Sequence, residues 1–377
     1  SFGRPAARPR LWRHIDVSPR FAKWGWEVHA DLPEPGHVVL ERVGPGGFTA
    51  RAVRWPVDGP SIPGARLRVR SAPLYSPGEW VALQRLNAGG EELSDGERLR
   101  SDPKGRLSFE LTGSAEHLAI RQPGSDAEPV AVAHRFDSGR FLRQGQEEDL
   151  WLRIWNRGGT TSPPMRLQLD TPQNEVELRM AAADLSALAP GETVWAGPFR
   201  LTRRGDPPST GARPEVALRL TFRDEQDREW TDQVELPVWY DVPVWEDVEI
   251  EDGRSGGTPW PVRGRGNGNG IAEAGERILL TRGGIPVFVQ LDEDRIPRSA
   301  ESISYTNRQP EGTNARDVIN RVSLLDLPDD LPDGTRIRLL ARQEEEVCRP
   351  HPRDPEAYWH HREVHWGQIE LTVHSPE

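Results

Sequence analysis

The stretch EVALRLTFR, residues 215–223, alternates apolar and polar side chains with a period of two. In a strand, Val216, Leu218, Leu220 and Phe222 would share one face, and the residues between them would share the other. An apolar face opposite a polar face is typical of antiparallel sheets that have one side on a core and one in water. The sequence therefore predicts an all-β protein. The same alternation occurs in RLRVR (66–70), MRLQLD (165–170), RIRLLAR (336–342) and QIELTV (368–373).

The composition agrees with many short strands. Gly and Pro contribute 36 and 35 of the 377 residues and are dispersed along the chain, which favours short strands joined by turns. The 14 tryptophans supply large units of apolar burial for a packed interior. The length predicts two or three domains.

Charge and cysteine content narrow the classes of partner. The formal net charge of −11 argues against nucleic acid and anionic membranes, because both require a basic face. No apolar run approaches the roughly 18–20 residues of a membrane span. Cys348 is the single cysteine, so no internal disulfide is expected. The first residues, SFGRPAARPRLWRH, lack the apolar core of a signal peptide.

Three segments are predicted, spanning residues 1–125, 130–245 and 246–377. The second and third contain four features in the same order: an acidic turn before a strand, a strand ending in Asp, a Leu-Pro segment with a turn, and a closing strand rich in Trp and Val. We therefore expect three consecutive antiparallel β-sandwich domains of immunoglobulin-like type. NARDVINRVSLLD, residues 314–326, is the best candidate for a short helix.

The stretch GRGNGNGIAEAGE, residues 264–276, has the spacing of a twelve-residue calcium loop when it is counted from its arginine. The sixth position is then Gly270, where such loops turn sharply. The residues predicted to bind the metal are Asn267, Asn269, Ile271 through its carbonyl, Glu273 and Glu276.

The first position of this loop contradicts the calcium pattern, because Arg265 is a cation where an aspartate is expected. A calcium site would need a carboxylate from outside the loop, and Asp252 and Glu251 are the candidates. The alternative interpretation is a plain glycine-rich turn at the start of the third segment. A phosphate-binding loop is disfavoured, because neither a Lys-Ser/Thr pair nor a helix start accompanies the glycines.

Two further patterns could carry chemistry. GRSGG, residues 253–257, matches the nucleophile motif G-x-S-x-G at Ser255, but Pro259 and Pro261 prevent the helix that must follow it. A C-terminal cluster contains potential zinc or copper ligands at a spacing that matches no standard site. We expect a long polar loop with surface histidines there. The cluster comprises Cys348, His351, His360, His361, Glu363 and His365.

Tryptophans occur in close pairs, which could form sugar-binding platforms. Side chains two or four residues apart on a strand also share one face, where they can cover a sheet, and this core role is the commoner use. The pairs are Trp24 and Trp26, Trp151 and Trp155, and Trp239 and Trp245.

Parts of the sequence are similar to known families. The first segment contains WGWEV (24–28), RWPVDGP (54–60) and SDPKGRL (101–107), and it resembles the β-rich region downstream of the catalytic domain in large secreted bacterial proteins of the enterochelin-esterase type. The later segments contain LAPGETVWAGPFRL and NGNGIAEAGE, with Ala274 in place of a usual proline, and they resemble CARDB-like, immunoglobulin-type sandwiches of bacterial surface proteins. The resemblance implies structural motifs and no catalytic residue in this chain.

These observations predict a non-catalytic extracellular or periplasmic bacterial protein that acts as a structural, assembly or adhesion module. Self-association into a homopolymeric surface filament is one form of this hypothesis, since serial sandwiches expose edge strands. Two alternatives remain. The chain could be the accessory region of a secreted esterase whose α/β-hydrolase domain lies outside it, or it could be a carbohydrate-binding module. Calcium is the one cofactor predicted.

Overall fold

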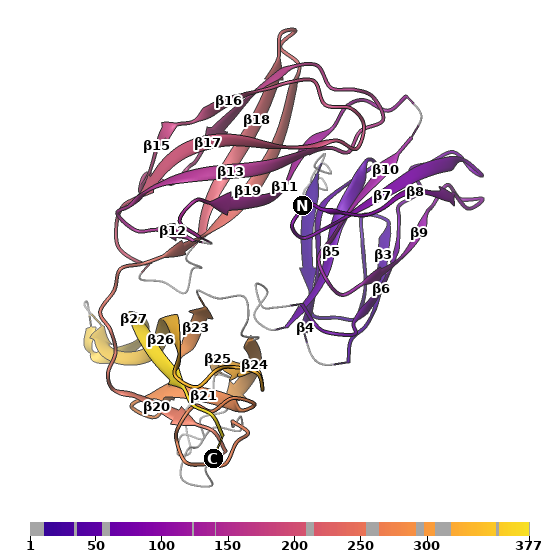
Figure 1. The fold of residues 1–377 in the computed structure, drawn as a ribbon. Helices are drawn as coiled ribbons and strands as arrows, with labels where there is room; N and C mark the ends of the chain where they lie inside the picture. The colour runs from indigo at the N-terminus through magenta and orange to yellow at the C-terminus, as the bar shows by residue number, and fades with distance from the viewer. Residues whose placement is uncertain are drawn as a thin grey trace. The chain divides into compact units, whose positions relative to one another are not determined.

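All regular elements of the described residues are β-strands, as the alternating pattern predicts (Figure 1). Nearly all neighbouring strands are antiparallel; β12 (Leu142–Arg143) and β19 (Glu229–Trp239) run parallel. Within the described ranges, no helix has the length and apolar character to cross a membrane. The computed structural model describes residues 11–33, 36–54, 61–122, 124–139, 141–208, 215–253, 264–291, 298–305, 318–351 and 354–376.

The first sandwich pairs a six-stranded sheet with a four-stranded sheet. In spatial order, the larger sheet consists of β1 (Trp12–Asp16), β4 (Gly36–Gly44), β5 (Gly47–Arg54), β10 (Glu116–Arg121), β7 (Trp80–Asn87) and β8 (Glu92–Arg100). The smaller sheet consists of β2 (Arg20–Lys23), β3 (Trp26–Asp31), β6 (Arg66–Arg70) and β9 (Ser108–Thr112).

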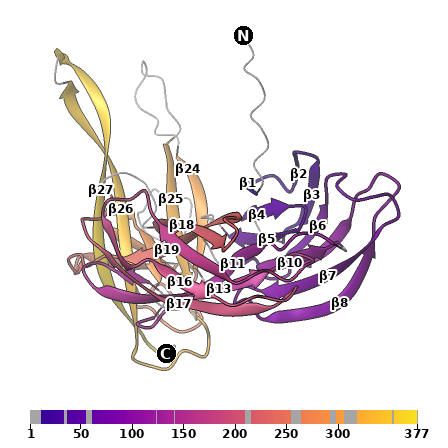
Figure 2. The ribbon, with the colours of Figure 1, turned by 90° about the horizontal axis from the view of Figure 1, so that it is seen from above.

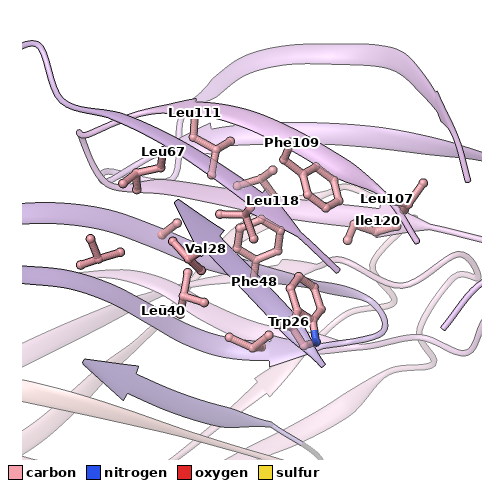
Figure 3. Packing of buried hydrophobic residues seen from close by; sticks show 14 of the residues in the cluster. Trp26, Val28, Leu40, Phe48, Leu67, Leu107, Phe109, Leu111, Leu118 and Ile120 are labelled. Carbon is pink, nitrogen blue, oxygen red and sulfur yellow. The ribbon is translucent and has the colours of Figure 1, made fainter. Parts of the chain in front are cut away.

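An aromatic row crosses the core between these two sheets (Figure 3). Phe48 of β5 lies between Trp26 of β3 and Phe109 of β9, with ring centroids 5.3 and 5.1 Å apart and the rings packed edge to face. All three side chains are buried. Edge-to-face packing adds to the stabilisation that their apolar burial provides. The row therefore ties the two sheets together through the side chain of Phe48.

The motif WGWEV forms the turn between β2 and β3 and the start of β3. Trp24 and Gly25 both have positive φ, 47° and 84°, as the two central residues of a type I′ hairpin turn require. Trp26 then points into the core, whereas Trp24 is 40% exposed and packs on the edge of Trp12. This motif therefore serves the fold.

The second sandwich is built from a four-stranded and a five-stranded sheet. Strand β18 (Glu215–Asp224), which contains the alternating stretch, buries Val216, Leu218, Leu220 and Phe222 completely. The period-two prediction is confirmed there. The first sheet consists of β11 (Pro129–Phe136), β13 (Glu147–Asn156), β17 (Thr193–Arg203) and β15 (Val176–Met180). The second consists of β12, β19, β18, β14 (Met165–Asp170) and β16 (Ala182–Leu185).

The third pair of sheets contains the remaining strands. Its core is formed by apolar side chains from both sheets, among them Ile278, Leu325, Leu339 and Ile369. One sheet consists of β20 (Val248–Glu251), β21 (Arg277–Arg282), β25 (Val318–Asp326) and β24 (Arg298–Tyr305), with β22 (Ile285–Pro286) paired to β21. The other consists of β23 (Phe288–Leu291), β26 (Thr335–His351) and β27 (Asp354–Val373).

The prediction of a short helix over residues 314–326 is wrong for its described part. Residues 318–326 form β25, which lies between β21 and β24 and pairs with both. Val318, Ile319 and Val322 are β-branched, and such residues favour strands. Pairing on two sides therefore outweighs the weak helical periodicity. Residues 314–317 lie outside the described residues.

Strands β26 and β27 form a long hairpin, which Figure 2 shows as a twisted ribbon. Its pairing runs from Thr335 opposite Val373 to His351 opposite Asp354, with a shift in register after Pro350. In the described chain, β23 pairs with this hairpin along residues 339–342 of β26. The base of the hairpin therefore belongs to a three-stranded sheet, and its outer part is a two-stranded ribbon.

The chain forms two compact units. The first comprises Ser1–Gly139, Gln146–Arg203 and Val216–Leu236, so it holds the first sandwich and most of the second. The second comprises Arg140–Gly145, Arg204–Glu215 and Pro237–Glu377, and it holds the third. The boundaries predicted near residues 125 and 245 stay predictions.

Replacing Phe48 by alanine tests the aromatic row. We expect Phe48→Ala to lower the free energy of unfolding of the first unit by about 3–5 kcal/mol, because it opens a cavity between two sheets. Chemical denaturation followed by tryptophan fluorescence measures this change. Val17→Ala is the control, since Val17 is 62% exposed and should change stability by no more than about 0.5 kcal/mol. Equal effects of the two substitutions would contradict the assignment.

Candidate metal centre

The loop formed by residues 264–276 connects to β21 and starts with a short backbone pairing. The Arg265 amide donates to the Arg277 carbonyl at 2.6 Å, and the Arg277 amide donates back at 2.9 Å. The Arg265 side chain is exposed. Arg265 therefore contributes its backbone to the base of the loop, and it does not act as the first ligand of a calcium loop.

Two consecutive asparagine turns shape the tip of the loop. The Asn269 amide donates to Oδ1 of Asn267 at 2.9 Å, and the Ile271 amide donates to Oδ1 of Asn269 at 2.7 Å. Asparagine suits both positions, because its side chain accepts from the backbone two residues later. The glycines between them, Gly268 and Gly270, both have φ of 78°. The spacing N-G-N-G is thus explained by local backbone geometry.

Two buried glutamates accept hydrogen bonds from this loop. Glu273 accepts from Nδ2 of Asn267 at 2.7 Å and from Nδ2 of Asn269 at 3.0 Å. Glu276 accepts from the backbone amides of Asn267 at 2.9 Å and Glu273 at 3.2 Å. The two glutamates are 3% and 8% exposed. The loop therefore folds around two carboxylates that are removed from water.

Asp252 provides a third carboxylate from outside the loop. It follows β20 directly, is fully buried, and accepts a hydrogen bond from the Gly270 amide through Oδ2 at 3.0 Å. Its Oδ1 atom is buried without a hydrogen-bond partner among the described residues. Sequence reasoning required an outside carboxylate from Asp252 or Glu251, and the structure brings the Asp252 side chain to the loop.

These carboxylates accept from uncharged donors. In the described chain, each hydrogen bond to Asp252, Glu273 or Glu276 comes from a backbone or asparagine N–H group. The pKa of Glu276 is raised above its ordinary value. Burial is the largest cause, the backbone hydrogen bonds from Asn267 and Glu273 oppose it, and the charges of Asp252 and Glu273 add to it. Buried negative charge without a cation is costly. The cluster therefore has a surplus of negative charge.

The backbone approaches these carboxylates at a glycine. A Cβ atom on Gly266 would lie 2.1 Å from Oε1 of Glu276 and 2.7 Å from the carbonyl oxygen of Asp252, so a larger residue does not fit at this position.

No three His, Cys, Asp or Glu side chains in the described part of the chain already form a metal-ligating group. The amide groups of Asn267 and Asn269 instead hold the Glu273 carboxylate.

The other sequence-predicted sites fall wholly or mostly outside the described residues. Ser255 lies outside the described residues. The Cys-His cluster falls on the β26–β27 hairpin, in place of the expected polar loop, with Cys348 opposite His360 in the backbone register and His361 one pair further along. The side chain of His365 is exposed. The side chains of the other cluster members lie outside the described residues.

The paired tryptophans mostly serve the fold. Trp26, Trp155 and Trp239 are buried, and Trp245 packs partly buried against the third core. Trp151 instead lies on a sheet surface, where the guanidinium of Arg135 is 5.7 Å from its ring centroid. The same guanidinium lies 4.6 Å from the Trp195 ring centroid, a pairing that was not predicted. Arginine stacking is a stabilising use of such rings.

Comparison with known proteins gives limited similarity. No protein-family model and no curated protein matches the chain. Among solved structures, it is similar to the crystal structure of BcpA, the major pilin subunit of Bacillus cereus, with 10% identity, coverage of 66% of this chain and 91% of that chain, and a TM-score of 0.19. A variant of that pilin subunit matches at 7% identity, with coverage of 79% and 94% and a TM-score of 0.20.

Proposed function

We propose that the chain is a non-catalytic extracellular module with a structural or assembly role. The observation that carries this proposal is the junction between the first and second sandwiches. Buried charged side chains in the first unit are used there to join one sandwich to the other. Such use of buried charge supports a fixed internal geometry, which a structural module requires.

The centre of this junction is an ion pair between Arg42 and Asp232. Arg42 Nε lies 2.9 and 3.0 Å from the two carboxylate oxygens of Asp232, and Arg42 Nη2 donates to the Gln233 carbonyl at 2.9 Å. Asp232 also accepts from the Ala131 amide at 2.9 Å. The two charged side chains are 16% and 4% exposed. The pair therefore joins β4 to both sheets of the second sandwich.

A second buried arginine extends the junction. Arg157, 2% exposed, donates through Nε to Glu128 and through Nη1 to the carbonyl of Arg42, both at 2.9 Å. Trp155 also donates through Nε1 to Gln84 Oε1 at 3.2 Å. The polar contacts surround an apolar cluster contributed by both sandwiches, which consists of Leu86, Ala119, Val130, Val132 and Trp155.

A strongly shifted titratable group in this unit also belongs to the packing. His117 of β10 is 6% exposed, and its Nδ1 lies 2.8 Å from Oγ1 of Thr49. Burial first, and then the charge of Arg42, lower its pKa to about 3. Perturbed groups often mark active sites, but structural networks perturb them as well. Here the neighbours of the imidazole belong to the sheet and the junction, which supports a structural role.

Open sheet edges support self-association as the form of this function. In the second sandwich, β15 and β16 are the terminal strands of their sheets. A terminal strand offers backbone donors and acceptors to another chain, which can add a strand there. The partner we propose is therefore a second copy of this chain.

Association and catalysis are measurable on the purified chain. We expect sedimentation velocity to show larger species as concentration rises, and ester hydrolysis to stay at the rate of a buffer blank. Hydrolysis above the blank would contradict a non-catalytic module. Tryptophan quenching by polysaccharides, without self-association, would favour the carbohydrate-binding alternative. A monomer at all concentrations would rule out self-assembly.

Substituting Asp232 tests the junction. Asp232→Asn leaves the positive charge of Arg42 buried without its partner, so we expect stability to fall by about 3–5 kcal/mol. We also expect the two sandwiches of the first unit to melt separately in calorimetry. Asp184→Asn is the matched control, because the Arg166–Asp184 pair is 64% and 81% exposed and contributes less than about 1 kcal/mol. Equal losses would contradict the proposed junction.

The buried imidazole of His117 predicts a pH dependence. Its pKa is about 3 in the folded chain against an ordinary 6.5, so between these values the unfolded chain binds the extra proton. Stability from this group therefore falls as pH drops from about 7 toward 3, by at most about 1.4 kcal/mol per pH unit. Urea unfolding at pH 7 and pH 4.5 measures the slope.

The contribution of His117 to this slope is separable from its contribution to stability. His117→Gln should reduce the pH slope by one proton. Thr49→Val removes the hydroxyl group beside the ring but keeps the imidazole, so it should lower stability and leave the slope unchanged. An unchanged slope in His117→Gln would show that this histidine does not cause the dependence.

A further inference from the structure

We propose that the loop of residues 264–276 and Asp252 together bind one calcium ion at the start of the third sandwich. The ligands we assign are the carboxylates of Asp252, Glu273 and Glu276, the side-chain oxygens of Asn267 and Asn269, and the carbonyl oxygen of Ile271. This site is separate from the junction on which the proposed function rests.

The first support is the free oxygen of Asp252. This side chain is fully buried, its Oδ2 accepts from the Gly270 amide, and its Oδ1 has no hydrogen-bond partner among the described residues. A buried polar atom without a partner is costly, and such atoms are rare in native proteins. Because Oδ2 already contacts the loop, a cation bound inside the loop is a suitable partner for Oδ1.

The second support is charge. Counted as a calcium loop, residues 265–276 place an arginine at the first position and asparagines at the third and fifth. The Arg265 side chain is exposed and cationic, so the first position of the loop supplies no ligand. Asp252, which follows β20, brings a carboxylate to the loop in its place. The three buried carboxylates of Asp252, Glu273 and Glu276 then supply more than enough negative charge to neutralise one divalent cation. The outside ligand thus replaces the one that the loop sequence lacks.

The chemistry of the ligands selects the type of ion. All six assigned ligands are oxygen atoms, from carboxylates, side-chain amides and one carbonyl. Calcium takes six to eight such oxygens in flexible geometry, whereas magnesium keeps several waters in a strict octahedron. Zinc favours nitrogen and sulfur ligands. The loop contains neither histidine nor cysteine.

Binding requires a specific rearrangement. At present Nδ2 of Asn267 and Nδ2 of Asn269 donate to the two carboxylate oxygens of Glu273. A cation that approaches Glu273 replaces these two donors, and the asparagines then turn oxygen toward the ion. Without the ion, the side-chain amides of Asn267 and Asn269 therefore compensate part of the charge of Glu273, and these hydrogen bonds keep the loop folded.

The loop is connected to the rest of the third sandwich by backbone hydrogen bonds. The Ala274 amide donates to the His374 carbonyl at 2.9 Å, and the Gly275 amide donates to the Leu327 carbonyl at 3.0 Å. The Leu327 amide donates to the Glu276 carbonyl at 2.8 Å. The loop therefore joins the segments that follow β25 and β27. An ion that stabilises the loop should stabilise the whole third sandwich.

The test uses the full chain, freed of metal with EGTA and then dialysed. Isothermal titration with calcium chloride should show one ion bound per chain, and magnesium chloride should bind at least tenfold more weakly. Calorimetry should show that calcium raises the unfolding temperature of the second unit, because a ligand that binds only the folded state stabilises it. The transition of the first unit should not move.

Two substitutions locate the ion. Asp252→Asn keeps the size of the side chain and removes its charge, so calcium affinity should fall at least tenfold. Asp247→Asn is the control: Asp247 lies at the other end of β20, pairs with Arg282 and is 63% exposed, so the loss of its charge should leave calcium affinity unchanged. Circular dichroism confirms that each variant is folded.

Three outcomes would overturn the proposal. One is the absence of calcium binding by the metal-free wild-type chain, a result that requires no variant. Another is wild-type affinity in folded Asp252→Asn. If that variant does not fold, Asn269→Ala tests the same site, because it keeps all three carboxylates. The third outcome is that Asn269→Ala binds calcium with wild-type affinity and calcium does not change the unfolding temperature of the second unit, which would exclude binding in this loop.

Discussion

The carboxylate of Asp232 is the acceptor on which the first unit depends. It receives the guanidinium of Arg42 from the first sandwich and the amide of Ala131 from the neighbouring sheet of its own sandwich. A buried guanidinium and a buried carboxylate each require several hydrogen bonds to offset the loss of water. Because three elements meet at one side chain, each can hold its position only when the other two are in place.

Buried carboxylates have different hydrogen-bond partners in the two units. In the first unit, buried carboxylates face guanidinium groups, as Asp232 faces Arg42 and Glu128 faces Arg157. In the second unit, Glu273 and Glu276 face amides alone among the described residues. Opposite charge compensates a buried carboxylate far better than a neutral dipole does. The first arrangement thus pairs its carboxylates with cations of the chain itself, and the proposed calcium ion would give the second a cation as well.

Many strands were predictable from the sequence because the alternation of apolar and polar residues within a strand indicates it without reference to the strand's neighbours. A period of two in residues 215–223 requires one buried face, whatever the neighbours are. The same reasoning failed for residues 318–326, where pairing with two neighbouring strands decides the structure. The spacing of residues 264–276 indicated candidate ligands, which remain a proposal, but it could not show that Asp252, and not Glu251, contacts the Gly270 amide of the loop. The Arg42–Asp232 pair spans 190 residues, and no local pattern indicates it.

The β26–β27 hairpin has a consequence for the order of folding. Its pairing can start at its outer end, where His351 lies opposite Asp354, and extend pair by pair to the base, so each step costs little chain entropy. Strand β21 has no such local start with β25, because Arg277 pairs with Asp326. The base of the hairpin also supplies Ile337, Leu339, Ile369 and Leu371 to the third core. We therefore expect the C-terminal end of the chain to form the nucleus of the second unit, and the glycine-rich loop to close over it last.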